Sequence, residues 1–201
     1  MTRRIGYPEA FRNVDPSTLW CDPKTALPDE WAPRGRWRIG QAMHTFTDDY
    51  RQEFFWRRPE EGALIATAAH ICTAPDYTVW VEDPDEWARH QAWRSAVVGA
   101  FWQSRGVTVI PVMSWCSALQ DYIAPGSLWA VRGPRRDDNG SWRERAAVFE
   151  DTLEPGAVLV FGNEPPAGAF SCPVIRRPLN SSKVEALHTK RDEAEQLRKA
   201  A

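Results

Sequence analysis

The sequence lacks any long apolar run: no stretch of its 201 residues approaches the ~20 apolar residues that a bilayer-spanning helix needs. Its first residues also lack the apolar centre of a secretory signal peptide. Cysteine is scarce, and its four copies form no C-x-x-C pair: Cys21, Cys72, Cys116 and Cys172. We therefore expect a cytoplasmic protein with reduced thiols, no membrane partner and no metal site. The one alternative is an irregular zinc site made of His70, Cys72 and a distant cysteine.

Several catalytic signatures are missing as well. The sequence contains no G-x-x-x-x-G-K-[ST] phosphate loop, no G-x-G-x-x-G after a predicted strand, no G-x-S-x-G elbow and no H-E-x-x-H pair. These absences argue against P-loop nucleotide hydrolysis and against hydride transfer on a dinucleotide-binding fold. They leave any cofactor unidentified and leave open whether the protein is an enzyme. A Cys–His nucleophilic pair also stays open, because Cys72 and Cys116 fall near the predicted ligand-binding face.

Lysine is rare too, since only four of the 25 basic residues are lysines. Together with abundant alanine, this bias indicates a high-GC bacterial genome. The formal net charge of −2 provides no overall attraction to nucleic acid or to a membrane, so nucleic-acid binding would need a local patch. Tryptophan, in contrast, occurs 11 times. Most of these side chains are expected in the core, because exposing so many indoles would create adhesive patches.

The length of 201 residues fits a single domain. Prolines recur too often over residues 1–62 for a long helix, while tryptophans interrupt the segment, so we predict a Pro-rich, irregular N-terminal arm packed on the domain. Residues 63–180 form the predicted core domain. Residues 181–201 form a predicted C-terminal helix that begins with a capping box of Ser182 and Glu185.

The core segment alternates between short apolar runs and helical patterns. The clearest helix has Asp83 as its predicted N-cap and Pro84 in its first position, and Gly106 ends it; a second helix is predicted over residues 142–153. Pro111 predicts a strand end or a bulge. The predicted strands are 63–66, 107–113, 127–131 and 157–161. This alternation predicts an α/β fold with a mostly parallel sheet of about four to five strands and flanking helices, either an open three-layer sheet or a partial TIM-like barrel.

Ligands of parallel α/β sheets bind beyond the carboxyl ends of the strands, which identifies candidate residues without any motif. Asp76, Glu164 and His70 are the candidate catalytic groups, since a carboxyl group or an imidazole can act as general acid or base. Each also has a plain structural explanation: a turn for the two carboxylates and a loop contact for the histidine. Trp115 and Asn163 follow two further strands and are candidate binding residues, although a tryptophan there also suits the core.

The loop from Arg132 to Arg136, with the sequence RGPRR, is the more specific signal. The guanidinium groups of Arg132, Arg135 and Arg136 suit bidentate recognition of phosphate or carboxylate. Asp137 and Asp138 follow directly and could instead neutralise the loop from within. We predict that this loop binds an anion or a nucleic acid.

Several segments carry a family resemblance: TAPDYTVW at residues 73–80, the Trp87…Trp93-Arg94…Gly99 pattern, and Gln103…GVTVIPVMSW ending at Trp115. The later PGS at 125–127 and VLVFG at 158–162 fit the same pattern. Over roughly residues 60–165 the chain resembles a bacterial family known only as a domain of unknown function, which occurs in phages, prophages and other mobile elements. The resemblance implies a mobile-element context, in which nucleic-acid transactions, defence and counter-defence are common roles, and it implies no particular activity.

Three hypotheses follow. The first is a phage or plasmid accessory protein that associates with DNA, RNA or nucleotides through the arginine loop, helped by Arg176, Arg177 and a basic C-terminal helix. The second is an enzyme that acts on a small phosphorylated or nucleotide-like substrate at the carboxyl ends of the strands, with Asp76 or Glu164 as general base and an arginine of the loop holding the anion. The third is a factor that binds a host protein, which would need no such site.

Overall fold

The computed structural model describes residues 7–80, 82–135 and 139–179. Its strands are β1 (Trp31–Pro33), β2 (Ala42–His44), β3 (Ile71–Thr73), β4 (Thr108–Ile110), β5 (Leu128–Arg132), β6 (Ala157–Phe161) and β7 (Val174–Arg177). Its α-helices are α1 (Asp49–Arg57), α2 (Pro59–Ala69), α3 (Asp85–Gln103) and α4 (Asn139–Leu153). Short 3-10 turns lie at Glu9–Phe11, Pro16–Thr18 and Ser117–Asp121.

Every strand pairing in these residues is parallel, and the spatial order of the strands follows the sequence. Ladders join β1 to β4 into one sheet and β5 to β7 into another. A parallel bridge between Val112 and Ala130 connects the two sheets, and the amide of Met113 donates to the carbonyl of Ala130 over 2.8 Å. The predicted α/β class with a parallel sheet is confirmed. The seven strands exceed the predicted number, because β1 and β2 lie in the segment expected to be irregular and β7 follows the last predicted strand.

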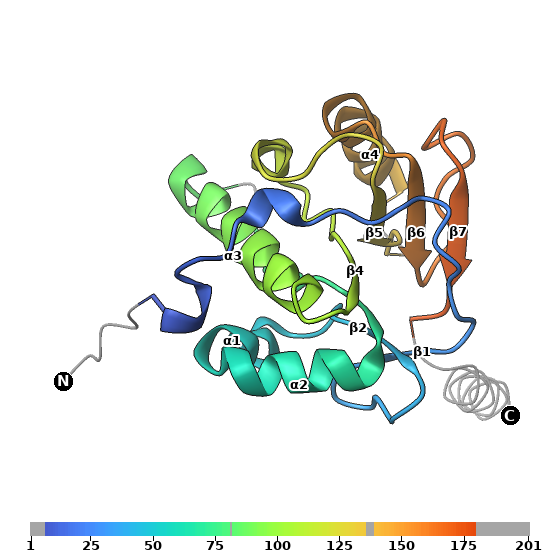
Figure 1. Cartoon of the computed structure of the whole chain (residues 1–201). Helices are drawn as coiled ribbons and strands as arrows, with labels where there is room; N and C mark the ends of the chain where they lie inside the picture. The colour runs from blue at the N-terminus through green and yellow to red at the C-terminus, as the bar shows by residue number, and fades with distance from the viewer. Residues whose placement is uncertain (1–6, 81, 136–138, 180–201) are drawn as a thin grey trace, which may run out of the picture.

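The row of strands curves until its two edges, β1 and β7, approach each other as in a partial barrel (Figure 1). No ladder joins these edges in the described residues, and side chains bridge the gap instead. Arg177 donates from Nε to the carbonyl of Pro28 over 2.9 Å and forms an ion pair with Asp29 at 3.3 Å. The buried rings of Trp31 and Phe161 meet edge to face with centroids 5.1 Å apart. We call this junction of β1 and β7 the seam.

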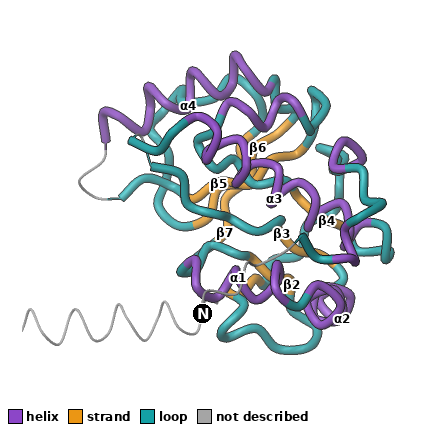
Figure 2. The backbone as a smooth tube through the Cα atoms, turned by 90° about the vertical axis from the view of Figure 1, so that its left-hand side faces the viewer, coloured by secondary structure: helices purple, strands orange, loops and turns teal. Residues whose placement is uncertain are grey.

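The helices lie outside the strands (Figure 2). Helices α1 and α2 cover the end of the row near β2, and α4 lies at the opposite end beside β5 and β6. Helix α3 is the long helix that the sequence predicts, with Asp85 and Glu86 in its first turn. Its N-cap is Pro84 and not Asp83, because the Asp83 carboxylate accepts the backbone N–H of Trp80 over 2.8 Å. The strand after it ends at Ile110, one residue before Pro111, as a residue without a backbone donor requires.

The strand predicted over residues 63–66 is wrong: this segment belongs to helix α2. Pro59 occupies the first turn together with Glu60 and Glu61, which favours a helix start. Alanines then recur at helical spacing and form the buried side of α2: Ala63, Ala66 and Ala69. The strand follows the helix instead of preceding a loop, since β3 occupies Ile71–Thr73. A short apolar run is compatible with a strand or with a helix, and here the preceding proline and acidic residues favour the helix.

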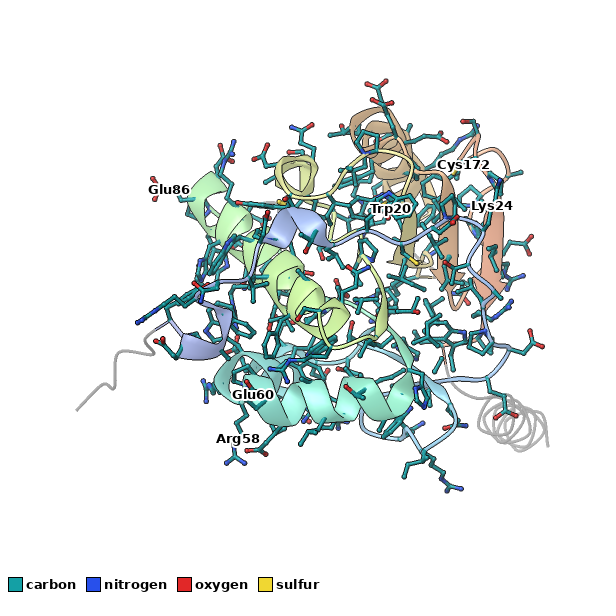
Figure 3. The ribbon with its side chains drawn as sticks, in the orientation of Figure 1. Trp20, Lys24, Arg58, Glu60, Glu86 and Cys172 are labelled. Carbon is teal, nitrogen blue, oxygen red and sulfur yellow. The ribbon has the colours of Figure 1, made fainter. Side chains whose placement is uncertain are left out.

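Residues 7–30 pack on the strands and on α3. The side chain of Gln103 bonds both backbone groups of Trp20, labelled in Figure 3, over 3.3 and 2.6 Å. The amide of Leu128 donates to the carbonyl of Cys21 over 2.8 Å. The predicted C-terminal helix, residues 181–201, lies outside the described residues. In the residues that the structure covers, no helix has both the length and the apolar character that crossing a membrane requires.

Candidate functional site

Two adjoining cavities open at the carboxyl ends of the strands, with volumes of ≈ 370 and ≈ 480 Å³. Both are bordered by Phe46, Thr78, Arg132 and Arg135, so they form one cleft. The first, which we call the polar half, is also lined by Arg36, His44, Thr47, Asp48, Asp49 and Arg51. The second, which we call the aromatic half, is also lined by Asp76, Tyr77, Trp80, Met113, Ser114, Trp115 and Trp142. These volumes lie within the range of roughly 300–1,000 Å³ that is usual for small-molecule sites.

Arg132 and Arg135 form the wall that the two halves share. Arg132 is the last residue of β5 and Arg135 follows in the next loop, and both side chains are exposed. Neither forms an ion pair with an acidic side chain in the described parts of the chain, whereas Arg176 pairs with Glu164 at 3.2 Å. As far as the described residues go, both guanidinium groups are therefore available to an anionic ligand. Arg136, the third arginine of the loop, lies outside the described residues.

Neighbouring elements hold the arginine loop in place. The side-chain amide of Asn163 donates to the carbonyl of Pro134 over 2.8 Å, and the indole N–H of Trp142 donates to the carbonyl of Arg132 over 3.2 Å. Gly133 lies so close to the backbone carbonyl of Asn163 that a Cβ atom there would overlap it. Asn163 thus supports the backbone of the loop, and its contact with a ligand stays a prediction.

Asp76 is a half-buried carboxyl group in the wall of the aromatic half. The hydroxyl of Ser114 donates to its Oδ1 over 3.2 Å. Loss of solvent raises the pKa of Asp76 to about 6, more than the hydrogen bond from Ser114 lowers it; the nearby Asp49 raises this pKa further and Arg132 lowers it. A carboxyl group that titrates near neutral pH can both accept and donate a proton, as a general acid–base must.

The loop that carries Asp76 is fixed by helices α1 and α3. The carboxylate of Asp49 accepts hydrogen bonds from the backbone N–H and the hydroxyl of Thr78, over 3.3 and 2.9 Å. The amide of the buried Gln52 donates to the backbone carbonyl of Asp76. The hydroxyl of Ser95 donates to the carbonyl of Pro75, the residue before Asp76, over 2.7 Å. The carboxyl group is thus held in place before any ligand arrives.

A buried arginine supports the same loop from behind. The guanidinium of Arg94, which is 4% exposed, lies 4.1 Å from the ring centroid of Tyr77 and 4.8 Å from that of Trp56. It pairs with Glu53 at 2.6 Å and donates to Gln91 over 2.9 Å. This cluster fixes Tyr77, the residue next to the candidate acid–base group.

Trp115 has a backbone φ of 51°, which is rare for a bulky side chain. Its ring meets the rings of Trp142 and Phe149 edge to face, at centroid distances of 5.5 and 5.3 Å. The guanidinium of Arg145 lies 5.0 Å from its centroid. Backbone strain of this kind persists only where the surrounding structure enforces it, and it often occurs at functional sites. The Trp115 ring therefore has a fixed orientation in the wall of the cleft.

Two predicted catalytic residues lie away from the cleft. His70 is exposed at the amino end of β3, because the strand predicted before it is helix α2. Glu164 follows β6, but its exposed carboxylate pairs with Arg176 and borders a separate cavity beside Arg143 and Glu144. Neither residue contributes to the walls of the two cavities described above.

All four cysteines are free thiols, and three of them are buried. Burial raises the pKa of the Cys72 and Cys116 thiols, which favours their protonated form at neutral pH. Cys172, labelled in Figure 3, comes before β7 and therefore lies at the amino end of the strands. Across the described ranges, no group of three or more His, Cys, Asp or Glu side chains is placed to hold a metal ion.

Sequence reasoning missed the polar half, because its residues come from the segment expected to be irregular. His44 ends β2 and is fully buried, and its Nε2 lies 2.7 Å from the carbonyl of Leu179. A carbonyl can only accept, so Nε2 carries the proton. Burial lowers the pKa of His44 to about 4, more than the Leu179 bond raises it, which keeps the imidazole neutral. The run from Ala42 to Phe46 after Gly40 was the signal that could have revealed this strand.

The fold and the cleft define a parallel α/β protein of the partial-barrel type, with an arginine-lined cleft at the carboxyl ends of its strands. Residues 34–133 match the family described as "Domain of unknown function (DUF4417)", which confirms the resemblance seen in the sequence. The matched segment includes Asp76, Trp115 and Arg132 of the cleft.

Two phage proteins are similar to the chain. The "Gene 1 protein" of Mycobacterium phage D29 is 37% identical over 132 residues, which cover 61% of this chain and 49% of the phage protein. The "Gene 1 protein" of Mycobacterium phage L5 is 36% identical over 146 residues, which cover 68% of this chain and 64% of the phage protein. The chain thus spans about half to two thirds of the length of these relatives. Both relatives are encoded by phages, which supports the predicted phage context. No solved structure matches the chain significantly.

Proposed function

We propose that the cleft binds the phosphate group of a small phosphorylated, nucleotide-like ligand, and that Asp76 transfers a proton in a reaction on this ligand. The observation that carries the proposal is the convergence of Arg132, Arg135 and Asp76 on one cleft. Guanidinium groups bind phosphate through paired N–H donors, and they do so best when no carboxylate competes for them. A carboxyl group with a pKa of about 6 supplies the acid–base function beside them.

The proposed phosphate binding is tested by titration with ribose 5-phosphate and with pyrophosphate, read by intrinsic tryptophan fluorescence. Removing charge-assisted hydrogen bonds costs about 1.5–3 kcal/mol each, so the Arg132→Gln/Arg135→Gln double variant should bind at least tenfold more weakly. Arg176→Gln is the matched control, because this arginine is exposed but already paired with Glu164. Equal affinity in the double variant, the control and the wild type would refute phosphate binding at the loop.

The proposed proton transfer by Asp76 is tested with a variant that keeps the shape of the cleft. Asp76→Asn preserves size and can still accept a hydrogen bond from Ser114, but it cannot exchange a proton. When phosphorylated candidate substrates are incubated with the protein and followed by ³¹P NMR, we expect wild type to convert one of them. Asp76→Asn should leave that compound unconverted even at concentrations that saturate the variant. Conversion by the variant at the wild-type rate would remove Asp76 from the mechanism.

Association with nucleic acid is the second candidate function, and the exposed indole of Trp80 at the cleft favours it. This side chain is 67% exposed and lines the aromatic half, where an unpaired base of a single strand could stack on it. The pairing of Arg176 and Arg177 with acidic residues weakens the wider basic surface that this hypothesis assumed. Titration with single- and double-stranded DNA at two salt concentrations tests it. Affinity that falls steeply with salt in wild type, and less steeply in the Arg132→Gln/Arg135→Gln variant, is the expected result; no binding at low salt would reject it.

A further inference from the structure

The aromatic half of the cleft contains more than phosphate recognition needs. Its wall combines Trp80, Trp115, Trp142 and Met113 with a polar pair, the Asp76 carboxyl group and the Ser114 hydroxyl. Flat aromatic walls with a few fixed polar groups recognise planar, hydrogen-bonding rings, and every nucleobase has a face that stacks on an indole. Inorganic phosphate or a sugar phosphate would leave this surface without a partner.

The position of the shared wall decides how a ligand would lie. Arg132 and Arg135 border both halves, so a phosphate bound there is adjacent to the aromatic half. Asp76 and Ser114 line only the aromatic half and not the polar half. The Asp76 carboxyl group therefore faces the part of the ligand that is not the phosphate.

The polar pair has hydrogen-bonding capacity to spare. Ser114 donates to Oδ1 of Asp76, and no other hydrogen bond to this carboxyl group occurs within the described residues. An ionised carboxyl group accepts up to about four hydrogen bonds. The N–H groups on the edge of a nucleobase are donors of the kind that this carboxyl group lacks.

The aromatic wall is rigid on one side and open on the other. Trp115 is locked by its strained backbone and by its ring contacts with Trp142 and Phe149. Trp80 is largely exposed and stacks on no other aromatic ring in the described part of the chain, which leaves its face accessible to a ligand. A fixed ring beside an accessible one suits a planar group that enters from solvent.

We propose that the aromatic half is a nucleobase site, so that the ligand of the cleft is a nucleoside phosphate with its base between Trp80 and Trp115 and its phosphate at Arg132 and Arg135. This inference rests on the proposed function, because it places the base relative to the phosphate bound at the arginine loop. It assigns the edge of the base, and not the phosphate, to Asp76 and Ser114.

The test compares the affinities for ribose 5-phosphate and for the four common ribonucleoside 5′-monophosphates, measured by isothermal titration calorimetry. Stacking of one base on aromatic side chains predicts that at least one nucleotide binds roughly tenfold or more tightly than ribose 5-phosphate. Trp80→Ala should reduce this ratio toward one without changing the affinity for ribose 5-phosphate. Trp115→Leu should do the same, and its retained binding of ribose 5-phosphate would show that it folds. Trp87→Ala is the matched control, because Trp87 is 45% exposed and does not line the cleft.

Nucleotides that bind wild type no more tightly than ribose 5-phosphate would overturn the nucleobase site. A ratio that persists in Trp80→Ala and in a folded Trp115→Leu variant would overturn it as well. Both results leave phosphate binding at the arginines intact. Failure of ribose 5-phosphate and of every nucleotide to bind, or binding that ignores Arg132 and Arg135, would instead reject the proposed function itself.

Discussion

Replacing Asp76 with asparagine should stabilise the protein above pH 6, although it removes the proposed acid–base group. Desolvation raises the pKa of Asp76 from 3.8 to about 6 in the folded chain. The folded state therefore binds more protons than the unfolded state between these two values, and the stability of wild type falls as pH rises through this window. A displacement of about two pKa units corresponds to at most about 3 kcal/mol. Because Asp76 is only half-buried, we expect about 1–3 kcal/mol at pH 8.

Urea unfolding of wild type and Asp76→Asn at pH 4, 6 and 8 measures this effect. The difference in unfolding free energy should grow in favour of the variant between pH 4 and pH 6 and then stay constant up to pH 8. For a chain of 201 residues, each kcal/mol corresponds to roughly 2–4 °C in Tm, so thermal melts at pH 8 provide a second reading. Glu164→Gln is the control, because this carboxylate is exposed and lies outside the cleft. A difference between Asp76→Asn and wild type that does not change with pH would refute the desolvated carboxyl group.

Three further changes test the supports of the cleft. His44 should remain a neutral imidazole at pH 5.5 in ¹⁵N NMR spectra, because burial lowers its pKa to about 4. Between pH 6.5 and 4 the folded wild type binds fewer protons at His44 than the unfolded chain does, so acidification destabilises it, and His44→Phe should reduce this loss of stability. Gly133→Ala should cost about 2 kcal/mol or more of unfolding free energy in urea and should weaken phosphate binding, because the added Cβ would overlap the carbonyl of Asn163. Gly140→Ala is the control and should be neutral or stabilising, because its Cβ meets no atom within 4 Å. Arg94→Met should cost about 2 kcal/mol in the same assay, since Glu53 loses its buried partner at 2.6 Å and keeps only the longer ion pair with Arg57 at 3.7 Å; a change below about 1 kcal/mol would contradict a structural role.

Much of the fold could be predicted from residues 83–161, where local signals and tertiary structure agree. Pro84 with two acidic residues begins α3, and the β-branched runs around Val109 and Val158 form strands. The N-terminal part could not be predicted in the same way, because β1 and β2 have three residues each, too short to show a period of two. Their pairing depends on long-range contacts that no local pattern encodes.

The candidate site was predicted where it depended on strand ends that the sequence located correctly. Trp115, Arg132 and Arg135 line the cleft because they lie at or after the ends of β4 and β5. Asp76 was predicted after a strand at 63–66, and it lines the cleft because β3, which ends at Thr73, takes the place of that strand. The prediction that His70 lies at the carboxyl end of a strand is wrong, because the segment before it is helix α2 and His70 lies at the amino end of β3. The polar half was missed because its side chains come from the shortest strands and from the loop before α1.

Among the described residues, the seam is the one junction of the partial barrel that has neither a backbone ladder nor a bridge. All the other strand junctions share backbone hydrogen bonds, so they can shift only by breaking a ladder or the bridge at Val112, whereas β1 and β7 are joined through the side chain of Arg177 and through packed rings. We expect the barrel to open first at this seam, which would separate His44 from Leu179, two residues that line the polar half. A ligand bound in the polar half would hold the two edges together, because Pro33 and His44 line this cavity from the β1 side of the seam and Leu179 lines it from the β7 side.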